Sequence, residues 1–103
     1  RGIYGIGECC PYRTIETENQ AGTVEAACQI ARLFIGEEAR EIRKLVRIMD
    51  GHLGGNASVK AAFDLALYDL NAKAVGLPLY RYLQGDNEKR IFTDMTVSLL
   101  SKI

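Results

Sequence analysis

The segment from Asn56 to Gly76 constrains the fold of this chain more than any other part of the sequence. Its apolar side chains recur at intervals of three and four residues, the spacing that places them on one face of an α-helix. An apolar surface so broad, with many small alanines, predicts a helix that packs tightly on more than one side. Asn56 is a favourable N-cap, and Gly76 suits the left-handed residue that ends a helix. The stripe comprises Val59, Phe63, Ala66, Leu67, Leu70 and Ala74, and Ala61, Ala62 and Leu65 widen it.

Three further helices are predicted around this one. The first begins at Thr17, where Thr17 to Gln20 fits a capping box, and stops at Gly36. The second covers residues 39–50, with charges of both signs on its solvent face. A short one covers residues 78–83, because proline suits a first helical turn. The apolar face expected for the first helix is Val24, Cys28, Ala31 and Ile35, flanked by Ala27, Ile30 and Phe34, and that of the second is Ile42, Leu45, Val46, Met49 and Leu53.

Extended segments stand at the two ends of the chain. Residues 2–8 carry glycine at every second or third position, which predicts a strand whose backbone approaches a neighbour closely. Residues 91–99 alternate from Met95 onward and form the best predicted strand. Two distant strands cannot form a stable sheet alone. The first residue, Arg1, is also not Met. We therefore expect an α+β unit that is a piece of a longer protein.

Composition excludes several classes of function. With 48% hydrophobic and 25% charged residues, the chain has the balance of a soluble globular protein. Its 13 basic and 13 acidic side chains cancel, so neither nucleic acid nor a membrane is an expected partner. The three cysteines are too few and odd in number for a disulfide scaffold, and no signal peptide is visible. We therefore expect a cytoplasmic location.

Two ligand motifs are incomplete. Gly5-Ile6-Gly7 resembles the start of a dinucleotide-binding loop, but Cys10 replaces its third glycine and Pro11 precludes the helix that should follow. A tight backbone position explains these glycines better. Cys9, Cys10, Cys28 and His52 could in principle bind zinc or form a thiol–imidazole pair, but no Cys-x-x-Cys pair is present. A buried Cys28 and a solvated His52 in a glycine loop are the favoured interpretations.

The carboxylates of the central helix are predicted to form local ion pairs. Lys60 and Asp64 are four residues apart, as are Asp69 and Lys73. The two aspartates point about 140° apart around the helix axis, so they cannot converge on one metal ion or substrate.

The loop from Cys10 to Ile15 has the composition of a binding site. It combines an aromatic, a guanidinium and a hydroxyl group on a non-helical segment held between a strand and a helix. An ordinary surface loop has the same composition. The residues by themselves therefore point to no reaction.

Three segments, in the right order, resemble the enolase superfamily. They are residues 5–11 (GIGECCP), residues 58–85 with SVKAAFDLALYDL, KAVGLPLY and LQG, and residues 93–98 (TDMTVS). The closest resemblance is to the muconate cycloisomerase/dipeptide epimerase-like branch of the mandelate racemase/muconate lactonizing enzyme family. It implies that residues 1–89 are a partial N-terminal capping domain. Residues 90–103 would then begin a TIM-type (β/α)8 barrel, whose first strand ends the chain.

In this family a magnesium ion, held by three carboxylates on barrel strands, stabilises the enediolate formed when the α-proton beside a carboxylate or carbonyl is removed. Barrel lysines act as acid and base. All these groups would lie beyond Ile103, so the resemblance assigns no catalytic and no metal-binding residue here. It implies that the strand-to-helix loop of the capping domain contacts the substrate. The expected contact residues are Tyr12, Arg13, Thr14, Ile15 and, on the first barrel strand, Thr96.

The resemblance implies a magnesium-dependent isomerase, and a dipeptide epimerase is the first expectation. Muconate cycloisomerase and o-succinylbenzoate synthase of the same branch are alternatives, as is a non-catalytic α+β interaction module. The expected partners are a small carboxylate substrate such as a dipeptide, the chain's own barrel, and further copies in a homo-oligomer.

Overall fold

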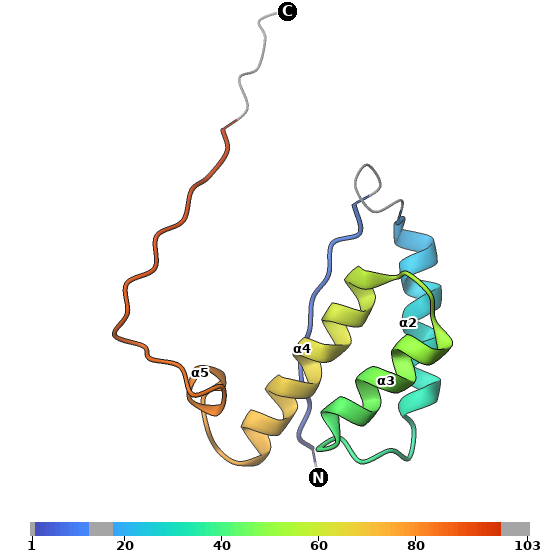
Figure 1. The fold of residues 1–103 in the computed structure, drawn as a ribbon, viewed down its shortest axis with the longest axis horizontal. Helices are drawn as coiled ribbons and strands as arrows, with labels where there is room; N and C mark the ends of the chain where they lie inside the picture. The colour runs from blue at the N-terminus through green and yellow to red at the C-terminus, as the bar shows by residue number, and fades with distance from the viewer. Residues whose placement is uncertain (1, 13–17, 98–103) are drawn as a thin grey trace, which may run out of the picture.

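The computed structural model describes residues 2–12 and 18–97, and helices dominate this part of the chain. They are α2 (Gln20–Phe34), α3 (Ile42–His52), α4 (Ala57–Ala74) and the short α5 (Leu79–Tyr82). Helices α2, α3 and α4 pack on one another, and α5 packs on α4 (Figure 1). Within the described ranges, no helix has both the length and the apolar character needed to cross a bilayer.

Helix α4 packs on several sides, as its broad apolar surface predicts. Helices α2 and α3 cover one side of it, α5 contacts its C-terminal half, and the extended segment 2–12 lies along another side. Phe63 of α4 meets Phe34 of α2 edge to face, with ring centroids 5.6 Å apart. The core between the three long helices consists of Ala26, Ile30, Met49, Leu53 and Val59, with Cys9, Ala27, Phe34, Val46 and Phe63 packed against it.

Helix α2 begins three residues later than predicted. Asn19 is its N-cap, and the Asn19 side chain accepts a hydrogen bond of 2.9 Å from the Gly22 amide. This bond satisfies one of the amides that the first turn leaves without an intrahelical partner. The predicted start at Thr17 is therefore wrong, and Thr17 itself lies outside the described residues.

The buried face of α2 also differs from the prediction. Thr23, Ala26 and Ile30 are buried, whereas Cys28 is exposed. Val24 and Ile35 expose 53% and 81% of their surface. Both neighbouring faces carry apolar residues, so periodicity alone could not choose between them. The packing of α2 against α3 and α4 decides which of the two faces is buried.

The turn between α3 and α4 corrects two expectations. Helix α3 starts at Ile42 and extends to His52, whose Nδ1 lies 2.9 Å from the Ile48 carbonyl oxygen, so His52 is not in the glycine loop. Asn56 occupies the N-cap position of α4 but caps nothing with its side chain. Its φ of 55° is left-handed, and its side-chain amide donates instead to the Gly54 carbonyl at 3.0 Å.

The C-terminal end of α4 matches its prediction. Gly76 adopts a left-handed φ of 70°. The Gly76 amide donates to the Lys73 carbonyl at 3.1 Å, and the Leu77 amide to the Ala72 carbonyl at 3.0 Å. This pair of bonds is a Schellman motif, which satisfies carbonyls at the helix end and favours glycine at the left-handed position. The stop at Gly36, with a φ of 82°, is likewise confirmed.

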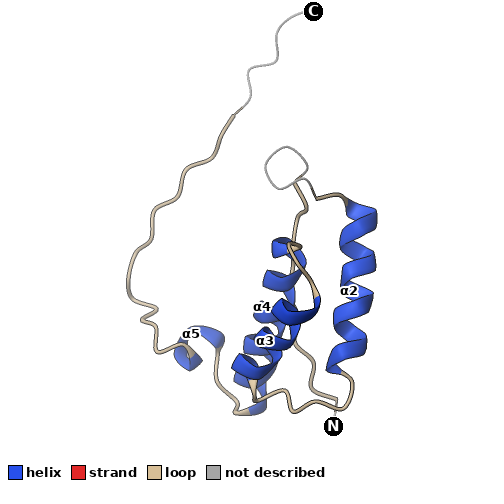
Figure 2. Cartoon of the chain, turned by 45° about the vertical axis from the view of Figure 1, so that its right-hand side comes forward, coloured by secondary structure: helices blue, strands red, loops and turns tan. Residues whose placement is uncertain are grey.

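The two predicted strands are extended but unpaired in the described residues, none of which forms a strand. Segment 2–12 runs along α4, and residues 86–97 lead away from the helices (Figures 1 and 2). A strand requires a hydrogen-bonded neighbour. The helical part of the expected architecture is thus confirmed, whereas the strand and barrel assignments remain predictions. Ser98 and Leu99, the end of the second predicted strand, lie outside the described residues.

Candidate functional site

The extended segment that leads into the candidate loop lies directly on the backbone of α4. A Cβ atom at Gly5 would overlap the Ala66 carbonyl oxygen, and one at Gly7 would overlap the Ala62 carbonyl oxygen. Ala62 and Ala66 are four residues apart and therefore lie on one row of the helix. Only glycine allows so close an approach. The interpretation of these glycines as tight backbone positions is confirmed.

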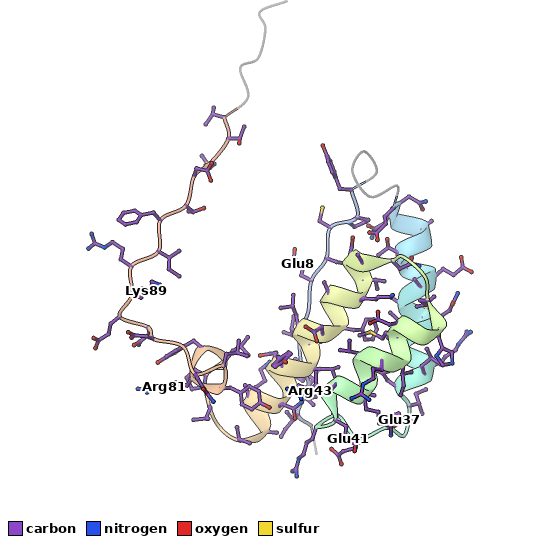
Figure 3. All side chains as sticks on the ribbon, in the orientation of Figure 1. Glu8, Glu37, Glu41, Arg43, Arg81 and Lys89 are labelled. Carbon is purple, nitrogen blue, oxygen red and sulfur yellow. The ribbon has the colours of Figure 1, made fainter. Side chains whose placement is uncertain are left out.

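Two side chains of α4 hold the same segment. Asp69 Oδ2 accepts hydrogen bonds from the Ile6 amide at 2.8 Å and from Lys73 Nζ at 2.6 Å. Lys73 Nζ also donates to the Tyr4 carbonyl at 3.2 Å and lies 5.2 Å from the centroid of the Tyr4 ring. The backbone groups of Tyr4 and Ile6 thus face the charged pair. The Glu8 side chain of this segment points away from the helices (Figure 3).

These contacts determine the ionisation of Asp69. The hydrogen bond from Lys73, followed by that from the Ile6 amide, lowers the pKa of Asp69 below its ordinary value of 3.8, although partial burial opposes the change. Both donors favour the ionised carboxylate over the neutral acid. The hydrogen bond that joins segment 2–12 to α4 at Ile6, which we call the tether, is therefore strongest when Asp69 is charged.

We predict that acid loosens this tether. Because the folded-state pKa of Asp69 is lowered, its contribution to stability is complete above the unfolded-state pKa of about 3.9 and is lost as pH falls through the folded-state value. The protection factor of the Ile6 amide is measured by hydrogen exchange from pH 6 down to about 2. It should fall once the pH drops below about 3.9. The Asp69→Asn variant should show weaker protection without the acid step. The same step in both proteins would contradict the assignment.

One of the two predicted local ion pairs is wrong. Asp69 and Lys73 pair as expected, at 2.6 Å. Lys60 does not pair with Asp64; its Nζ lies 3.0 Å from Asp50 Oδ1 on α3. The packing of α3 against α4 supplies this carboxylate from ten residues away, a contact that spacing along one helix cannot predict.

Glu18, the first described residue after the loop, also contacts α4. Glu18 accepts hydrogen bonds from both the backbone amide and the hydroxyl group of Ser58, the second residue of the helix. The hydrogen bond from the Ser58 amide to Glu18 measures 3.3 Å. Sequence reasoning missed this contact, because nothing in the pattern links Glu18 to a residue 40 positions away.

The structure describes only two of the five predicted substrate-contacting residues, Tyr12 and Thr96. Tyr12 is 56% exposed and stands at the end of the segment seated on α4. Arg13, Thr14 and Ile15 lie outside the described residues. Thr96 is exposed, and it belongs to residues 86–97, which lead away from the helices (Figures 1 and 2). The roles of all five residues remain predictions.

A largely apolar cavity of about 260 Å³ lies at the base of the loop. It opens between segment 2–12, α2 and α4. Cys9 and Pro11 contribute from the segment, Val24 and Ala27 from α2, and Phe63 from α4. The described residues on either side of the loop, Pro11 and Gln20, thus line an apolar cavity, and cavities of this kind are common beside ligand-contacting loops.

The described residues contain no catalytic centre that chemistry alone would identify. Cys9 is half-buried, Cys10 and Cys28 are exposed, and all three are free. The expectation of a buried Cys28 is therefore wrong. In residues 2–12 and 18–97, no group of three or more His, Cys, Asp or Glu side chains is placed to hold a metal ion. The class of protein that this part of the chain defines is a small, mostly helical domain.

Comparison with known families identifies this domain. Residues 1–84 match the family model for the N-terminal domain of mandelate racemase / muconate lactonizing enzyme. The chain belongs to this family, within the enolase superfamily, and it is the N-terminal capping domain, mostly helical, of such an enzyme.

Curated relatives include two kinds of isomerase. A D-Ala-D/L-Ala epimerase of Cytophaga hutchinsonii is 41% identical over 98 residues, which cover 95% of this chain and 27% of the epimerase. A chloromuconate cycloisomerase of Pseudomonas putida is 36% identical over 87 residues, which cover 82% of this chain and 24% of that enzyme. The chain thus spans about a quarter of the length of these relatives.

A solved structure shares the fold. A dipeptide epimerase from Cytophaga hutchinsonii, crystallised with Mg and the dipeptide D-Ala-L-Val, superposes with a TM-score of 0.87 at 41% sequence identity. The superposition covers 92% of this chain and 26% of that epimerase. The described fold is therefore one that occurs in a magnesium- and dipeptide-binding enzyme.

Proposed function

We propose that this chain is the substrate-selecting N-terminal part of a magnesium-dependent dipeptide epimerase, an isomerase that removes and returns an α-proton of a dipeptide. The observation that carries the proposal is the TM-score of 0.87 at 41% identity to an epimerase crystallised with Mg and D-Ala-L-Val. The proposed role of this chain is to present the loop from Cys10 to Ile15 to the substrate. Dipeptides such as those released from cell-wall peptide are the proposed substrate class.

The proposal includes a second domain outside this chain. Residues 1–89 would be the capping domain, and residues 90–103 would begin a TIM-type barrel, an architecture of about 250 residues. The exposed apolar side chains of Ile91, Phe92 and Met95 support this division, because barrel strands bury such residues. The described residues do not fit a magnesium site, so its ligands are assigned to the barrel.

Magnesium supplies positive charge that makes removal of a weakly acidic α-proton feasible. No proton transfer is assigned to a residue of this chain. We further propose a homo-oligomer and a cytoplasmic location, and the three free cysteines support that location.

Isotope exchange tests the proposed reaction. The full-length protein is incubated in D2O with Mg²⁺ and either D-Ala-L-Val or L-Ala-L-Ala. Deuterium at an α-carbon and the appearance of the second diastereomer, both followed by NMR, are the expected results, and removal of metal by EDTA should abolish them.

The cycloisomerase relative supports one alternative, a muconate cycloisomerase. Lactonisation of cis,cis-muconate without exchange of any dipeptide proton would favour it over epimerisation. A folded protein with neither activity would favour a non-catalytic interaction module.

We predict that Arg13→Ala changes which dipeptides are preferred but leaves the chemistry intact. A guanidinium group in the loop would recognise the carboxylate of a substrate, and one charge-assisted hydrogen bond is worth about 1.5–3 kcal/mol, or about tenfold to a hundredfold in kcat/KM. The measurement is kcat/KM for a panel of dipeptides, together with Mg²⁺ affinity. Loss of Mg²⁺ binding with an unchanged ranking of dipeptides would contradict this role.

A further inference from the structure

We propose that one face of α5 is the surface on which this domain packs against the barrel of its own chain. This surface rests on the proposed function, because the barrel is part of that proposal. The face, which we call the α5 face, consists of Tyr80 and Leu83, whose surfaces are 38% and 55% exposed. Val75 and Leu77, in the turn before α5, are exposed as well.

Helix α5 carries large apolar side chains on two opposite sides. Tyr82 faces α4, where its ring centroid lies 6.4 Å from that of Tyr68. Tyr80 precedes Tyr82 by two residues, which places the two side chains about 200° apart around the helix axis. Leu83 is three residues from Tyr80 and shares its side. The α5 face therefore points away from α4.

Only one of these two sides is covered. Among the described helices, α4 alone packs on α5, and it covers the side of Tyr82. A helix that is apolar all round is typically buried all round, because each apolar side chain is more stable away from water. The α5 face therefore fits a further packing partner with an apolar surface.

The backbone after α5 leaves from a fixed position beside this face. The Gln84 amide donates to the Arg81 carbonyl at 2.9 Å, and Gln84 has a left-handed φ of 60°. The Gly85 amide donates to the Tyr80 carbonyl at 2.6 Å. These two bonds form a Schellman motif, which fixes the direction of the chain at a helix end. Gly85 is thus held against Tyr80 itself.

The proposed barrel begins within reach of the α5 face. Residues 86–90 alone separate Gly85 from the strand predicted at 91–99, and five residues span at most about 18 Å. Ile91 and Phe92, at the start of that segment, are almost fully exposed (Figure 1). A domain on so short a connection has a high effective concentration at the surface beside its attachment point. The barrel is therefore the partner that the α5 face fits.

A photo-cross-link shows which part of the protein covers the α5 face. In the full-length protein, Tyr80 is replaced by p-benzoylphenylalanine, which keeps an aromatic ring at this position. The matched control carries the same replacement at Ile35, which is highly exposed after the end of α2. After irradiation, the products are separated by denaturing electrophoresis and mapped by mass spectrometry. We expect Tyr80 to cross-link within its own chain to residues beyond 103, and this product to be lost in the control.

Three results would overturn the proposal. One is a cross-link from Tyr80 to a second copy of the chain, which would make the α5 face an oligomer contact. Another is a cross-link within the chain to any part other than the residues beyond 103. The third is a yield at Tyr80 no higher than at Ile35, which would leave the α5 face uncovered.

The Leu83→Glu variant gives a measurement that needs no cross-linker. A carboxylate placed in an apolar contact loses its hydration, so the two domains should separate more often. We expect hydrogen exchange of residues 79–85, and of the barrel segment that cross-links to Tyr80, to be at least about tenfold faster than in the wild type. Leu83→Met, which keeps an apolar side chain of similar volume, should exchange like the wild type. Unchanged exchange of the barrel segment in Leu83→Glu would contradict the contact.

Neither measurement depends on catalysis, so failure of the proposed reaction is recognised separately. A cross-link beyond residue 103 in a protein that exchanges no dipeptide proton would support the α5 face and refute the reaction. An active epimerase without this cross-link would refute the α5 face and leave the reaction standing.

Discussion

The Gly7→Ala variant should unfold at a markedly lower urea concentration than the wild type, with a loss of about 3 kcal/mol or more. The added methyl group would overlap the carbonyl oxygen of Ala62, which belongs to the backbone of α4. A helix backbone cannot yield as a flexible side chain can, so the segment must lift from the helix. We expect the hydrogen bond between the Ile6 amide and Asp69 to break with it.

Gly51→Ala is the matched control for this substitution. Gly51 lies within α3, and a Cβ atom there would meet no atom within 4 Å. Alanine is a better helix former than glycine, so this variant should be as stable as the wild type or more stable by up to about 1 kcal/mol. Equal stability of Gly7→Ala and the wild type would show that the segment does not lie against α4 in solution.

The Ile30→Ala variant should lose about 2–5 kcal/mol of unfolding free energy. Ile30 is completely buried, and its side chain belongs to the core where α2 meets α3 and α4. Truncation removes apolar surface from a close-packed interior and leaves a cavity. Domains of ordinary size have total stabilities of about 5–15 kcal/mol, so this loss is a large share. Urea unfolding followed by circular dichroism measures it.

Ile35→Ala provides the comparison. Ile35 follows the last residue of α2 and is 81% exposed, so its truncation should change stability by no more than about 0.5 kcal/mol. The sequence-based pattern placed Ile35 on the buried face and Ile30 beside it. If Ile35→Ala were the more damaging variant, that pattern would describe the protein better than the structure does.

Much of the helical framework could be predicted from the sequence. The stripe on α3, the stops at Gly36 and Gly76 and the buried Val59 and Leu67 of α4 follow from spacing and from the preference of glycine for a left-handed backbone. The predicted stripe on α4 was wrong at Ala61, Leu65 and Ala74, which are exposed, and it omitted the buried Asn71 and Ala72. The helix starts were less predictable. Asn19 rather than Thr17 caps α2, because several residues near a helix start can compete as the cap.

The candidate site was predictable only as a composition. An aromatic, a basic and a hydroxyl side chain in the loop after Cys10 suggested a ligand, and the glycines before it suggested close backbone approach. The structure confirms the close approach at Gly5 and Gly7. The anchors Asp69 and Glu18 were missed, because each binds a residue far away in the sequence.

The sequence by itself determined roughly where the helices lie, how two of them end and which segment carries the loop. These features depend on interactions between residues close together in the chain, and the spacing of apolar residues and the positions of glycines predict such interactions. Only the tertiary structure decided which face of α2 is buried, that Lys60 pairs with Asp50, and that Ser58, Ala62 and Ala66 contact the described segments before and after the loop. Those contacts join residues from different elements, whose meeting depends on how whole helices pack.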